Sequence, residues 1–550
     1  MSEKITVGEA IALFLERCGQ AAAFGVISIH NMPILDAFAK RGKLRFVPAR
    51  GEAGAASMAD AYARVTGGLG VAITSTGTAA GNAAGAMVEA LTAGTPLLHL
   101  TGQIETPYLD KDLAYIHEAP DQLTMLGAVS KAAYRVRSPE TAIPVLREAV
   151  RNALTAPRGP VSVEIPIDIQ AALIDVPVNL EPLPVTTPDP DPADIDALAT
   201  ALAKARRPLL WLGGGARHAG AAVRRLADMG FGVVTSVQGR GVLPEDDART
   251  LGAFNLHPEV EDFYRSCDAM LVVGSRLRSN ETLKYQLALP RPLYRIDADA
   301  RADGRCYVAD YFVRGDAQKA LEALADKLEG KLEVDADFHR DLAATRERVV
   351  AKVRDGLGPY ARLVEALQLA IGRDFNWVRD VTVSNSTWGN RLLRIFDPRA
   401  GVHAMGGGIG LGLAMGIGAA VGSAAGDGRK TLCLAGDGGF ILNLGELATA
   451  AQEKAKLVIV LMNDRGYGVI KNIQDAQYGG RRCYVDLHTP DYAQLAQSLR
   501  IGHQRVSDLD EAGAALARAL AAQGPQLVEI DMLSIGSFSQ AFAGPPVRAK

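Results

Sequence analysis

Short apolar runs alternate with helical stretches along most of this 550-residue chain. The clearest runs span residues 69–74, 96–100, 208–212, 269–274, 431–435 and 457–462. Runs of this length are typical of strands in parallel sheets, because the connecting helices cover both faces of such a sheet and bury it. We therefore predict an α/β protein.

Two stretches divide the chain into segments. Residues 176–194 are rich in proline and lack a strand or helix period, and such segments form extended spacers. The second lies within residues 329–360, where a polar helix precedes the sequence Gly356-Leu357-Gly358-Pro359. At roughly 100–200 residues per domain, the chain length suggests about three domains. We expect three doubly wound parallel-sheet domains, at residues 1–176, 190–330 and 356–550.

Composition narrows the class of protein without indicating a function. Hydrophobic residues make up 48% of the chain and charged residues 22%, and the net charge of −3 gives no signal for nucleic acid. No apolar stretch approaches the roughly 20 residues of a membrane span, and the N-terminus lacks the apolar core of a signal peptide. The five cysteines are scattered without a CxxC pair, which disfavours a zinc site or disulfides. We expect a cytoplasmic protein that binds neither nucleic acid nor membrane.

Polar residues follow the last two apolar runs. The triplet Gly436-Asp437-Gly438 follows one run, Asn463 follows the other, and a helical stretch at residues 444–452 separates them. This order predicts a βαβ unit, in which the carboxyl ends of the two parallel strands meet at one edge of the sheet. Asp437 and Asn463 should therefore converge.

The residue types at this edge suit a metal that holds a diphosphate. Mg²⁺ prefers oxygen ligands, usually few from the protein and the rest from phosphate and water. Gly436, Gly438 and Gly439 would let backbone N–H groups approach phosphate oxygens. The triplet alone is also compatible with an ordinary strand-end turn, but the second ligand at this spacing favours the metal site.

The segment from Gly436 to Asn463 resembles the thiamine diphosphate (ThDP) motif, a GDG triplet followed at this spacing by an Asn. The resemblance implies that Asp437, Asn463 and the backbone carbonyl of Arg465 hold Mg²⁺, which in turn binds the ThDP diphosphate. The family often has Asn-Asn where this chain has Met462-Asn463.

Residues 52–64 have the form Glu-x-x-Ala-x-x-x-Ala-x-x-Tyr-Ala-Arg. This pattern resembles the acetolactate synthase and 2-oxoacid decarboxylase branch of ThDP enzymes. The resemblance implies that Glu52 is the activating carboxyl group, buried and in contact with the N1′ atom of the pyrimidine. From the residues alone, Glu52 also fits a helix N-terminus, where the helix dipole favours a carboxylate.

Other segments match the same branch. Residues 403–414 resemble the segment that bends the cofactor, with Ile409 as its apolar support and the Gly407 carbonyl as acceptor for the 4′-amino group; a close-packed glycine-rich helix is the alternative. Ser384, Asn385 and Ser386, after an expected strand at residues 381–383, would contact the diphosphate.

The resemblance covers almost the full chain, and it also implies an assembly. The N-terminal domain would bind the pyrimidine and the C-terminal domain the diphosphate. In the family the pyrimidine-binding domain of one subunit meets the diphosphate-binding domain of another. The resemblance therefore implies a homodimer or a homotetramer.

Positions on the expected substrate side depart from the family patterns. Ile29 is apolar, as in the oxalyl-CoA decarboxylase and 2-hydroxyacyl-CoA lyase branch, and Gln103 ends a Thr-Gly-Gln strand. His30 fits a proton donor, since its unperturbed pKa lies near 6.5, and it equally fits a packing residue. His117 stands where related enzymes carry Gln, and it replaces an amide by a group that can transfer a proton.

Bound ThDP would add to a carbonyl carbon and act as an electron sink for loss of CO₂ or an aldehyde. Our first hypothesis is ThDP- and Mg²⁺-dependent C–C bond cleavage or formation on a 2-oxo acid, by decarboxylation or by carboligation with an aldehyde or a second 2-oxo acid. Asn472 and Asn280 replace the Trp and Arg of true acetolactate synthases, and Val469 replaces the Glu of pyruvate decarboxylases. The chain is therefore acetolactate synthase-like without matching either enzyme.

Three alternatives stay open. A 2-hydroxyacyl-CoA lyase or oxalyl-CoA decarboxylase would need basic residues for the CoA phosphates, such as Arg481-Arg482 or the tail Arg548–Lys550. A non-catalytic ThDP-binding scaffold would not require Glu52. The glycines after the apolar runs 208–212 and 269–274 are compatible with a bound FAD or ADP in the central domain, and also with a purely structural domain.

Overall fold

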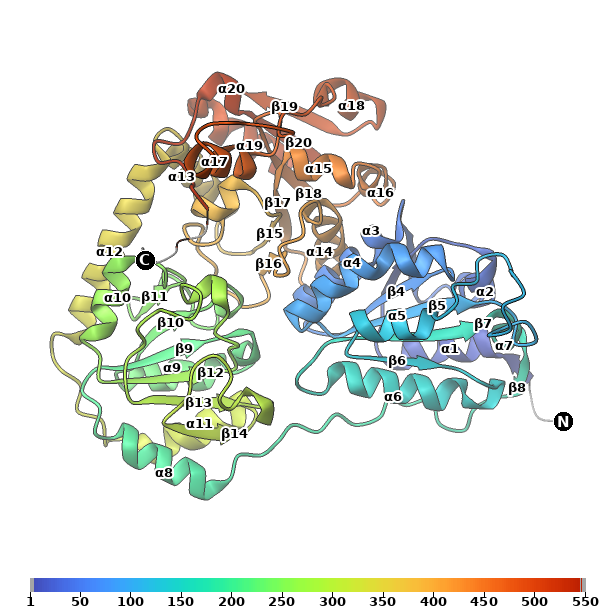
Figure 1. Cartoon of the computed structure of the whole chain (residues 1–550), viewed down its shortest axis with the longest axis horizontal. Helices are drawn as coiled ribbons and strands as arrows, with labels where there is room; N and C mark the ends of the chain where they lie inside the picture. The colour runs from blue at the N-terminus through green and yellow to red at the C-terminus, as the bar shows by residue number, and fades with distance from the viewer. Residues whose placement is uncertain (1–3, 545, 547–550) are drawn as a thin grey trace.

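Three six-stranded parallel sheets form the core of the protein in a computed structural model that describes residues 4–544 and 546. Figure 1 shows the N-terminal domain in blue and cyan, the central domain in green and the C-terminal domain in orange and red. Each sheet carries helices on both faces, so the predicted α/β class with three doubly wound parallel sheets is confirmed.

The N-terminal domain has the sheet order β3-β2-β4-β5-β7-β6, with a separate antiparallel pair β1-β8. Successive residues of a strand point to opposite faces, so Val71 and Ile73 of β4 pack into one core and Ala72 into the other. Its elements are β1 (Lys4–Thr6), α1 (Val7–Arg17), β2 (Ala22–Gly25), η1 (Ile29–Asn31), α2 (Met32–Arg41), β3 (Arg45–Pro48), α3 (Glu52–Thr66), β4 (Gly70–Thr74), α4 (Thr78–Ala93), β5 (Leu97–Gln103), α5 (Gln122–Val129), β6 (Ala132–Arg135), η2 (Pro139–Thr141), α6 (Ala142–Leu154), β7 (Pro160–Pro166), α7 (Ile167–Ala171) and β8 (Leu173–Asp175).

The central domain has the sheet order β11-β10-β9-β12-β13-β14. An extended segment crosses to it from the N-terminal domain and ends at α8, where Asp191 caps the helix (Figure 1). Its elements are α8 (Pro192–Leu202), β9 (Pro208–Leu212), η3 (Gly214–Ala216), α9 (Gly220–Asp228), β10 (Gly232–Thr235), η4 (Val237–Gly239), β11 (Thr250–Gly252), α10 (Pro258–Arg265), β12 (Ala269–Val273), η5 (Ser279–Glu281), β13 (Leu293–Asp297), η6 (Ala300–Ala302), β14 (Tyr311–Arg314) and α11 (Ala317–Leu328).

The C-terminal domain has the sheet order β16-β15-β17-β18-β20-β19, which repeats the strand order of the N-terminal domain. The long helix α12 leads into it from the central domain (Figure 1). Its elements are α12 (Phe338–Leu357), α13 (Tyr360–Ile371), β15 (Phe375–Arg379), the π-helix η7 (Asn385–Gly389), β16 (Gly401–His403), α14 (Gly412–Ala425), β17 (Lys430–Gly436), α15 (Asp437–Leu442), α16 (Glu446–Gln452), β18 (Leu457–Asn463), α17 (Gly468–Gln477), α18 (Tyr492–Ser498), β19 (Gly502–Val506), η8 (Leu509–Glu511), α19 (Ala512–Ala521), β20 (Gln526–Asp531) and α20 (Met532–Ile535).

The strand expected at residues 381–383 is wrong. The strand is β15, which ends at Arg379, and residues 381–383 lead into η7. Their β-branched side chains favour a strand, but the Thr382 hydroxyl accepts the backbone N–H of Asn385 at 2.9 Å and starts a helical turn instead. The observed strand contains polar residues such as Asn376, so it lacks the continuous apolar run from which the other strands were predicted.

The N- and C-terminal domains are held together by two helices, α3 and α14. A Cβ atom on Gly418 of α14 would lie 2.0 Å from the backbone oxygen of Met58 in α3, so only glycine allows this approach. The packed surface belongs to one continuous apolar core that joins both domains.

No helix in the described part of the chain is both long enough and apolar enough to cross a membrane.

Candidate active site

The strand order reverses between β2 and β4 in the N-terminal sheet, and at the corresponding point in the C-terminal sheet. Open α/β sheets bind ligands at such points. In the C-terminal domain this point lies between β15 and β17. The residues that follow β15 include Asp380, Ser384 and Asn385, and those that follow β17 include Asp437. Most of the predicted cofactor residues are thus brought to one end of one sheet.

Asp437 is the first residue of α15 and is fully buried. Its Oδ2 atom accepts the backbone N–H of Gly466 at 2.9 Å. Burial, followed by the neighbouring carboxylate of Asp464, raises the pKa of Asp437 to about 7. Two carboxyl groups held this closely favour a bound cation, which would compensate both negative charges.

Asn463 ends β18 beside Asp437. Its amide nitrogen donates to Glu529 Oε1 at 2.8 Å, which leaves Oδ1 as the ligand atom. Oδ1 also accepts the backbone N–H of Arg465 at 3.2 Å. The carbonyl of Arg465 accepts the backbone N–H of Leu487 at 3.1 Å and a longer hydrogen bond from Lys471 Nζ at 3.4 Å, which a bound cation would have to displace. These oxygens fit a hard divalent cation such as Mg²⁺.

The glycines of the triplet line the same position. A Cβ atom on Gly438 would lie 2.8 Å from the ring of Tyr467, and one on Gly439 would lie 2.9 Å from Asp380 Oδ2. A Cβ atom on Gly436 would lie 3.3 Å from the side chain of Thr382, slightly closer than an ordinary contact. Packing within the protein therefore favours glycine at positions 438 and 439, because a side chain there would come too close to Tyr467 or Asp380.

Segment 403–411 crosses in front of this sheet end. Gly407 and Gly410 have φ of 82° and 85°, which L-residues with side chains rarely adopt. The carboxylate of Asp380 accepts the Gly410 N–H at 3.0 Å, and burial raises the pKa of Asp380 to about 6. Ile409 is 39% exposed, so its side chain is free to contact a bound ligand.

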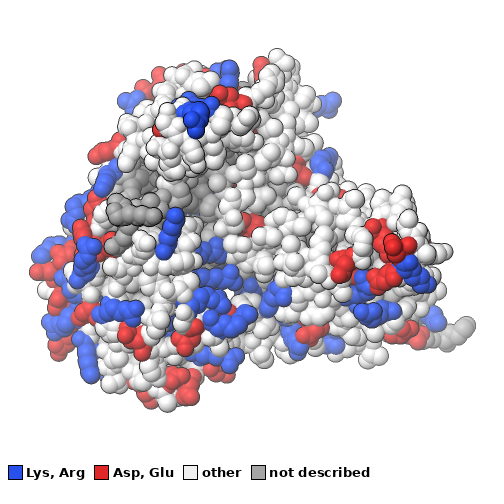
Figure 2. Space-filling model, viewed as in Figure 1, with Lys and Arg blue, Asp and Glu red and all other residues white. Residues whose placement is uncertain are grey.

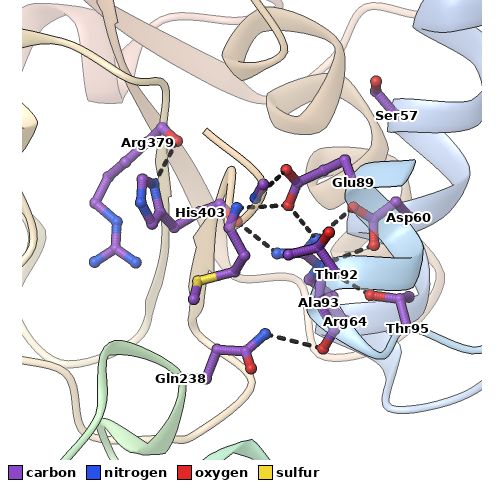
Figure 3. Close-up of polar contacts among 12 residues, drawn as sticks. Ser57, Asp60, Arg64, Glu89, Thr92, Ala93, Thr95, Gln238, Arg379 and His403 are labelled. Carbon is purple, nitrogen blue, oxygen red and sulfur yellow. Dashed lines mark hydrogen bonds and ion pairs between the residues drawn. The ribbon is translucent and has the colours of Figure 1, made fainter. Parts of the chain in front are cut away.

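A buried ionic cluster from the N-terminal domain holds the beginning of this segment (Figure 3). Glu89 of α4 accepts the backbone N–H groups of Met405 and Gly406 at 2.5 and 2.6 Å. Arg64 of α3 donates to the His403 carbonyl at 2.6 Å and pairs with Asp60 and Glu89. Removal of one partner from such a buried cluster typically costs about 3–5 kcal/mol, so the cluster fixes the segment in place.

The three predicted diphosphate residues differ in their surroundings. Ser384 and Asn385 are buried, and Ser384 Oγ and Asn385 Oδ1 have no hydrogen-bond partner among the described residues. Unpaired buried oxygens of this kind are costly unless water or a ligand satisfies them. Ser386 is half-buried, and its carbonyl accepts from Arg391 at 2.9 Å.

Glu52 is the first residue of α3, at the edge of the N-terminal domain. It is half-buried, not buried as expected, and its Oε2 accepts from Asn82 at 3.1 Å. The C-terminal domain anchors this end of α3, because buried Glu446 accepts the backbone N–H of Arg50 at 3.0 Å. Tertiary contacts thus determine the position of Glu52.

The substrate-side residues fall into two groups. Ile29, His30 and His117 lie together in the N-terminal domain, where Ile29 is 66% exposed and the two histidine rings are in contact. The side chain of Gln103 is buried and accepts the Thr76 hydroxyl at 2.9 Å. Val469 and Asn472 lie half-buried on α17 of the C-terminal domain.

The predicted site is divided between two domains of the chain. Within the described residues, no hydrogen bond or ion pair links Glu52, His30 or His117 to Asp437 or Asn463. Sequence reasoning missed Asp380, Glu89 and Glu446, and it included Arg64 only as the last residue of the pattern at 52–64. Asp380 directly follows β15, but this signal was hidden because the strand was expected at residues 381–383.

Comparisons with known proteins agree with this geometry. The N-terminal TPP binding domain of thiamine pyrophosphate enzymes matches residues 5–125, the central domain matches residues 195–324, and the C-terminal TPP binding domain matches residues 382–530. The chain belongs to the thiamine pyrophosphate (that is, ThDP) enzyme family, in the group that contains acetolactate synthases and 2-oxoacid decarboxylases.

Relatives match over nearly the whole chain. The probable 2-ketoarginine decarboxylase of Pseudomonas aeruginosa is 31% identical over 539 residues, which cover 96% of this chain and 94% of that protein. The acetolactate synthase isozyme 2 large subunit of Escherichia coli is 29% identical, with 94% and 93% covered. The probable acetolactate synthase large subunit of Methanocaldococcus jannaschii is 27% identical, with 95% and 91% covered.

Proposed function

We propose that this protein uses ThDP and Mg²⁺ to break or form a C–C bond next to the carbonyl group of a 2-oxo acid. The observation that carries the proposal is the position of Asp437 and Asn463 at the ends of adjacent strands, beside Gly436, Gly438 and Gly439. We assign residues 1–176 to pyrimidine binding, 190–330 to the central domain and 356–550 to diphosphate binding. A cytoplasmic location is part of this proposal.

Each residue of the site has one role in this proposal. Asp437, Asn463 and the Arg465 carbonyl would hold Mg²⁺. The residues that would contact the diphosphate of ThDP are Gly436, Gly438, Gly439, Ser384, Asn385 and Ser386. Gly407 and Ile409 would contact its rings. When bound, ThDP supplies the nucleophile and the electron sink. Glu52 would exchange a proton with the pyrimidine nitrogen, and His30 and His117 would move protons on the substrate side.

We infer that the complete site contains two copies of the chain. Glu52 is half-buried, although its role requires a desolvated carboxyl group. Large apolar side chains of both outer domains are exposed, with Ile27 at 59% and Ile116 at 72% in the N-terminal domain and Leu442 at 52% in the C-terminal domain. Exposed apolar patches of this kind favour burial by a partner. A homodimer or homotetramer would place the N-terminal domain of one copy on the C-terminal domain of another.

We expect the purified protein, supplied with ThDP and Mg²⁺, to release CO₂ from at least one 2-oxo acid. The screen should include pyruvate, 2-ketoarginine, branched 2-oxo acids, benzoylformate and acyl-CoAs, with carboligation products followed alongside CO₂. Turnover of acyl-CoAs alone would instead support the CoA lyase or oxalyl-CoA decarboxylase alternative. ThDP binding without turnover of any compound would favour the scaffold.

The acyl-CoA alternative has little support among the described residues. Arg481 is exposed, but Arg482 beside it pairs with Asp475 at 2.6 Å, so part of the charge of these two residues is already compensated. The tail Arg548–Lys550 lies outside the described residues. The 2-oxo acid reaction therefore stays the first proposal.

A second ligand is favoured by a cavity of about 490 Å³ at the carboxyl end of the central sheet. The strand order of this sheet reverses between β9 and β12, and both strands end in glycines that line the cavity. Figure 2 shows Lys and Arg side chains gathered where the central and N-terminal domains meet. The cavity lining includes Arg276, Arg278 and Arg305, which suit the phosphates of FAD or ADP.

We expect denaturation of the purified protein to release an adenine nucleotide from this cavity. Visible absorption of the native protein identifies FAD, because ADP is colourless there, and chromatography of the released compound identifies ADP. An Arg278→Gln variant should retain less nucleotide, because it loses one positive charge in the cavity. If neither compound is released and neither binds when added, the central domain is purely structural.

A further inference from the structure

A second cavity, of about 460 Å³, lies between the central and C-terminal domains. Helix α12, which runs from one domain to the other (Figure 1), forms one of its walls. The other walls come from β11 and the loop before it, from α13, and from residues 391–394, which follow η7. This cavity shares no lining residue with the central cavity or with the proposed ThDP site, so it is a separate feature of the molecule.

Two half-buried arginines line this cavity, and neither pairs with a carboxylate among the described residues. Arg346 of α12 donates only to backbone carbonyls, among them that of Asp247 at 3.1 Å. Arg391 donates from Nη1 to the Ser386 carbonyl at 2.9 Å, whereas its Nε atom is buried and lacks a hydrogen-bond partner in the described part of the chain. A buried donor of this kind is costly unless water or an anion accepts from it.

A third arginine, Arg394, lines the same cavity and is exposed. Its backbone N–H donates to Gln368 at 2.8 Å, but its side chain forms no hydrogen bond or ion pair with any described residue. Burial lowers the pKa of Arg346, the carboxylate of Glu245 raises it, and the charge of Arg394 lowers it further. The two guanidinium groups are therefore close enough to repel each other, and a bound anion would relieve that repulsion.

Most other charged groups of the cavity are already paired. Glu245 and Asp246 pair with arginines that lie outside the lining, and Arg354 pairs with Glu365 at 3.2 Å. Glu347 is the only carboxylate of the described lining that has no ion pair. Three unpaired arginines against one unpaired carboxylate leave two positive charges, which favour a dianion.

The cavity also has an apolar side, and its size suits a small organic ligand. Ligand pockets usually measure about 300–1,000 Å³ and combine an apolar lining with a few polar groups. A phosphate monoester carries about two negative charges near neutral pH, and its three free oxygens can accept from several arginines at once. The large apolar residues of the lining are Leu251, Phe254, Val350, Val364 and Leu392.

We propose that this cavity binds a small organic phosphate, whose phosphate group contacts Arg346, Arg391 and Arg394 and whose organic group packs against the apolar side. The site is additional to the proposed ThDP reaction and does not depend on it. Its occupation can therefore be measured while ThDP and Mg²⁺ are bound.

The test is calorimetric titration of the full-length protein, saturated with ThDP and Mg²⁺, with phenyl phosphate. We expect Arg394→Gln to weaken binding about tenfold, the lower end of the loss for a hydrogen bond to a charged group. Arg346→Gln should weaken it at least as much, but Arg394 is exposed, so Arg394→Gln keeps the fold even if Arg346→Gln does not.

Two control variants should bind phenyl phosphate as the parent protein does. Arg340→Gln changes another arginine of α12, which pairs with Asp337 at 2.6 Å and does not line the cavity. Arg278→Gln changes the central cavity instead. If Arg278→Gln weakened binding and Arg394→Gln did not, phenyl phosphate would occupy the central cavity and the proposal would be wrong.

Two matched probes test the class of ligand. Phenylacetate keeps the apolar ring but carries one negative charge, and inorganic phosphate keeps the charge but has no apolar group. Each should bind about tenfold more weakly than phenyl phosphate, because each lacks one of the two kinds of contact. Equal affinity for phenylacetate would overturn the phosphate assignment, and equal affinity for inorganic phosphate would overturn the organic group. Absence of phenyl phosphate binding, or equal affinity in Arg394→Gln and the parent protein, would overturn the site itself.

Discussion

Replacement of Glu52 by Gln is expected to reduce turnover by about 10²–10⁴-fold, the usual contribution of a positioned acid–base group. Gln keeps the size of the side chain but cannot exchange the proton on which activation of the cofactor depends. ThDP and Mg²⁺ should still bind, because Asp437 and Asn463 belong to another domain. Steady-state turnover and ThDP titration by calorimetry measure the two effects separately.

The matched control is Glu9→Gln. Glu9 lies in the first turn of α1, where it completes a capping box with Thr6, so it shares the favourable helix-dipole position of Glu52. A helix-terminal role alone predicts that both variants lose a little stability and keep full activity. Unchanged turnover in Glu52→Gln would falsify the assignment of Glu52 as activator.

Replacement of Asp437 by Ala is expected to weaken ThDP binding by more than about 100-fold, since loss of mere supporting contacts around a metal already costs 10–100-fold. The variant removes the buried carboxylate from a position where it accepts the Gly466 N–H and lies beside Asp464. Removal of Mg²⁺ with a chelator should weaken binding in the parent protein to a similar extent. ThDP titration at several Mg²⁺ concentrations measures both effects.

Asp486→Asn is the control for this prediction. Asp486 lies close to the metal-site loop, where its backbone pairs with Gly466, but its side chain is 85% exposed and contacts Lys471. An exposed pair contributes about 0–1 kcal/mol, so this variant should bind ThDP almost as the parent protein does. If Asp437→Ala kept both its ThDP affinity and its Mg²⁺ dependence, the proposed metal site would be wrong.

Local sequence patterns predicted a strand correctly where the apolar run of that strand was sufficient to identify it. The strand runs at 208–212 and 457–462 correspond closely to β9 and β18, because a buried parallel strand needs a continuous apolar run. The strand expected at 381–383 failed, because side chain to backbone hydrogen bonds outweighed the β-propensity of those residues. The short helix α15, directly after Gly436, was also not expected.

The positioning residues could not be found in the sequence. Glu89 binds the backbone of Gly406 across 317 positions, and Glu446 binds the backbone of Arg50 across 396 positions. No local pattern marks a carboxylate whose partner is a distant backbone N–H group.

The sequence by itself determined the α/β class, the family motifs around Asp437 and Glu52, and the positions at which the chain departs from its relatives. Those features depend on short-range chemistry, such as apolar runs that must be buried and glycines that must leave space. Only the tertiary structure decided that the rings of His30 and His117 meet, and that α3 and α4 hold segment 403–406. Such contacts form where the strand order of a sheet reverses and where two domains pack together. Both arrangements depend on residues that lie far apart in the sequence.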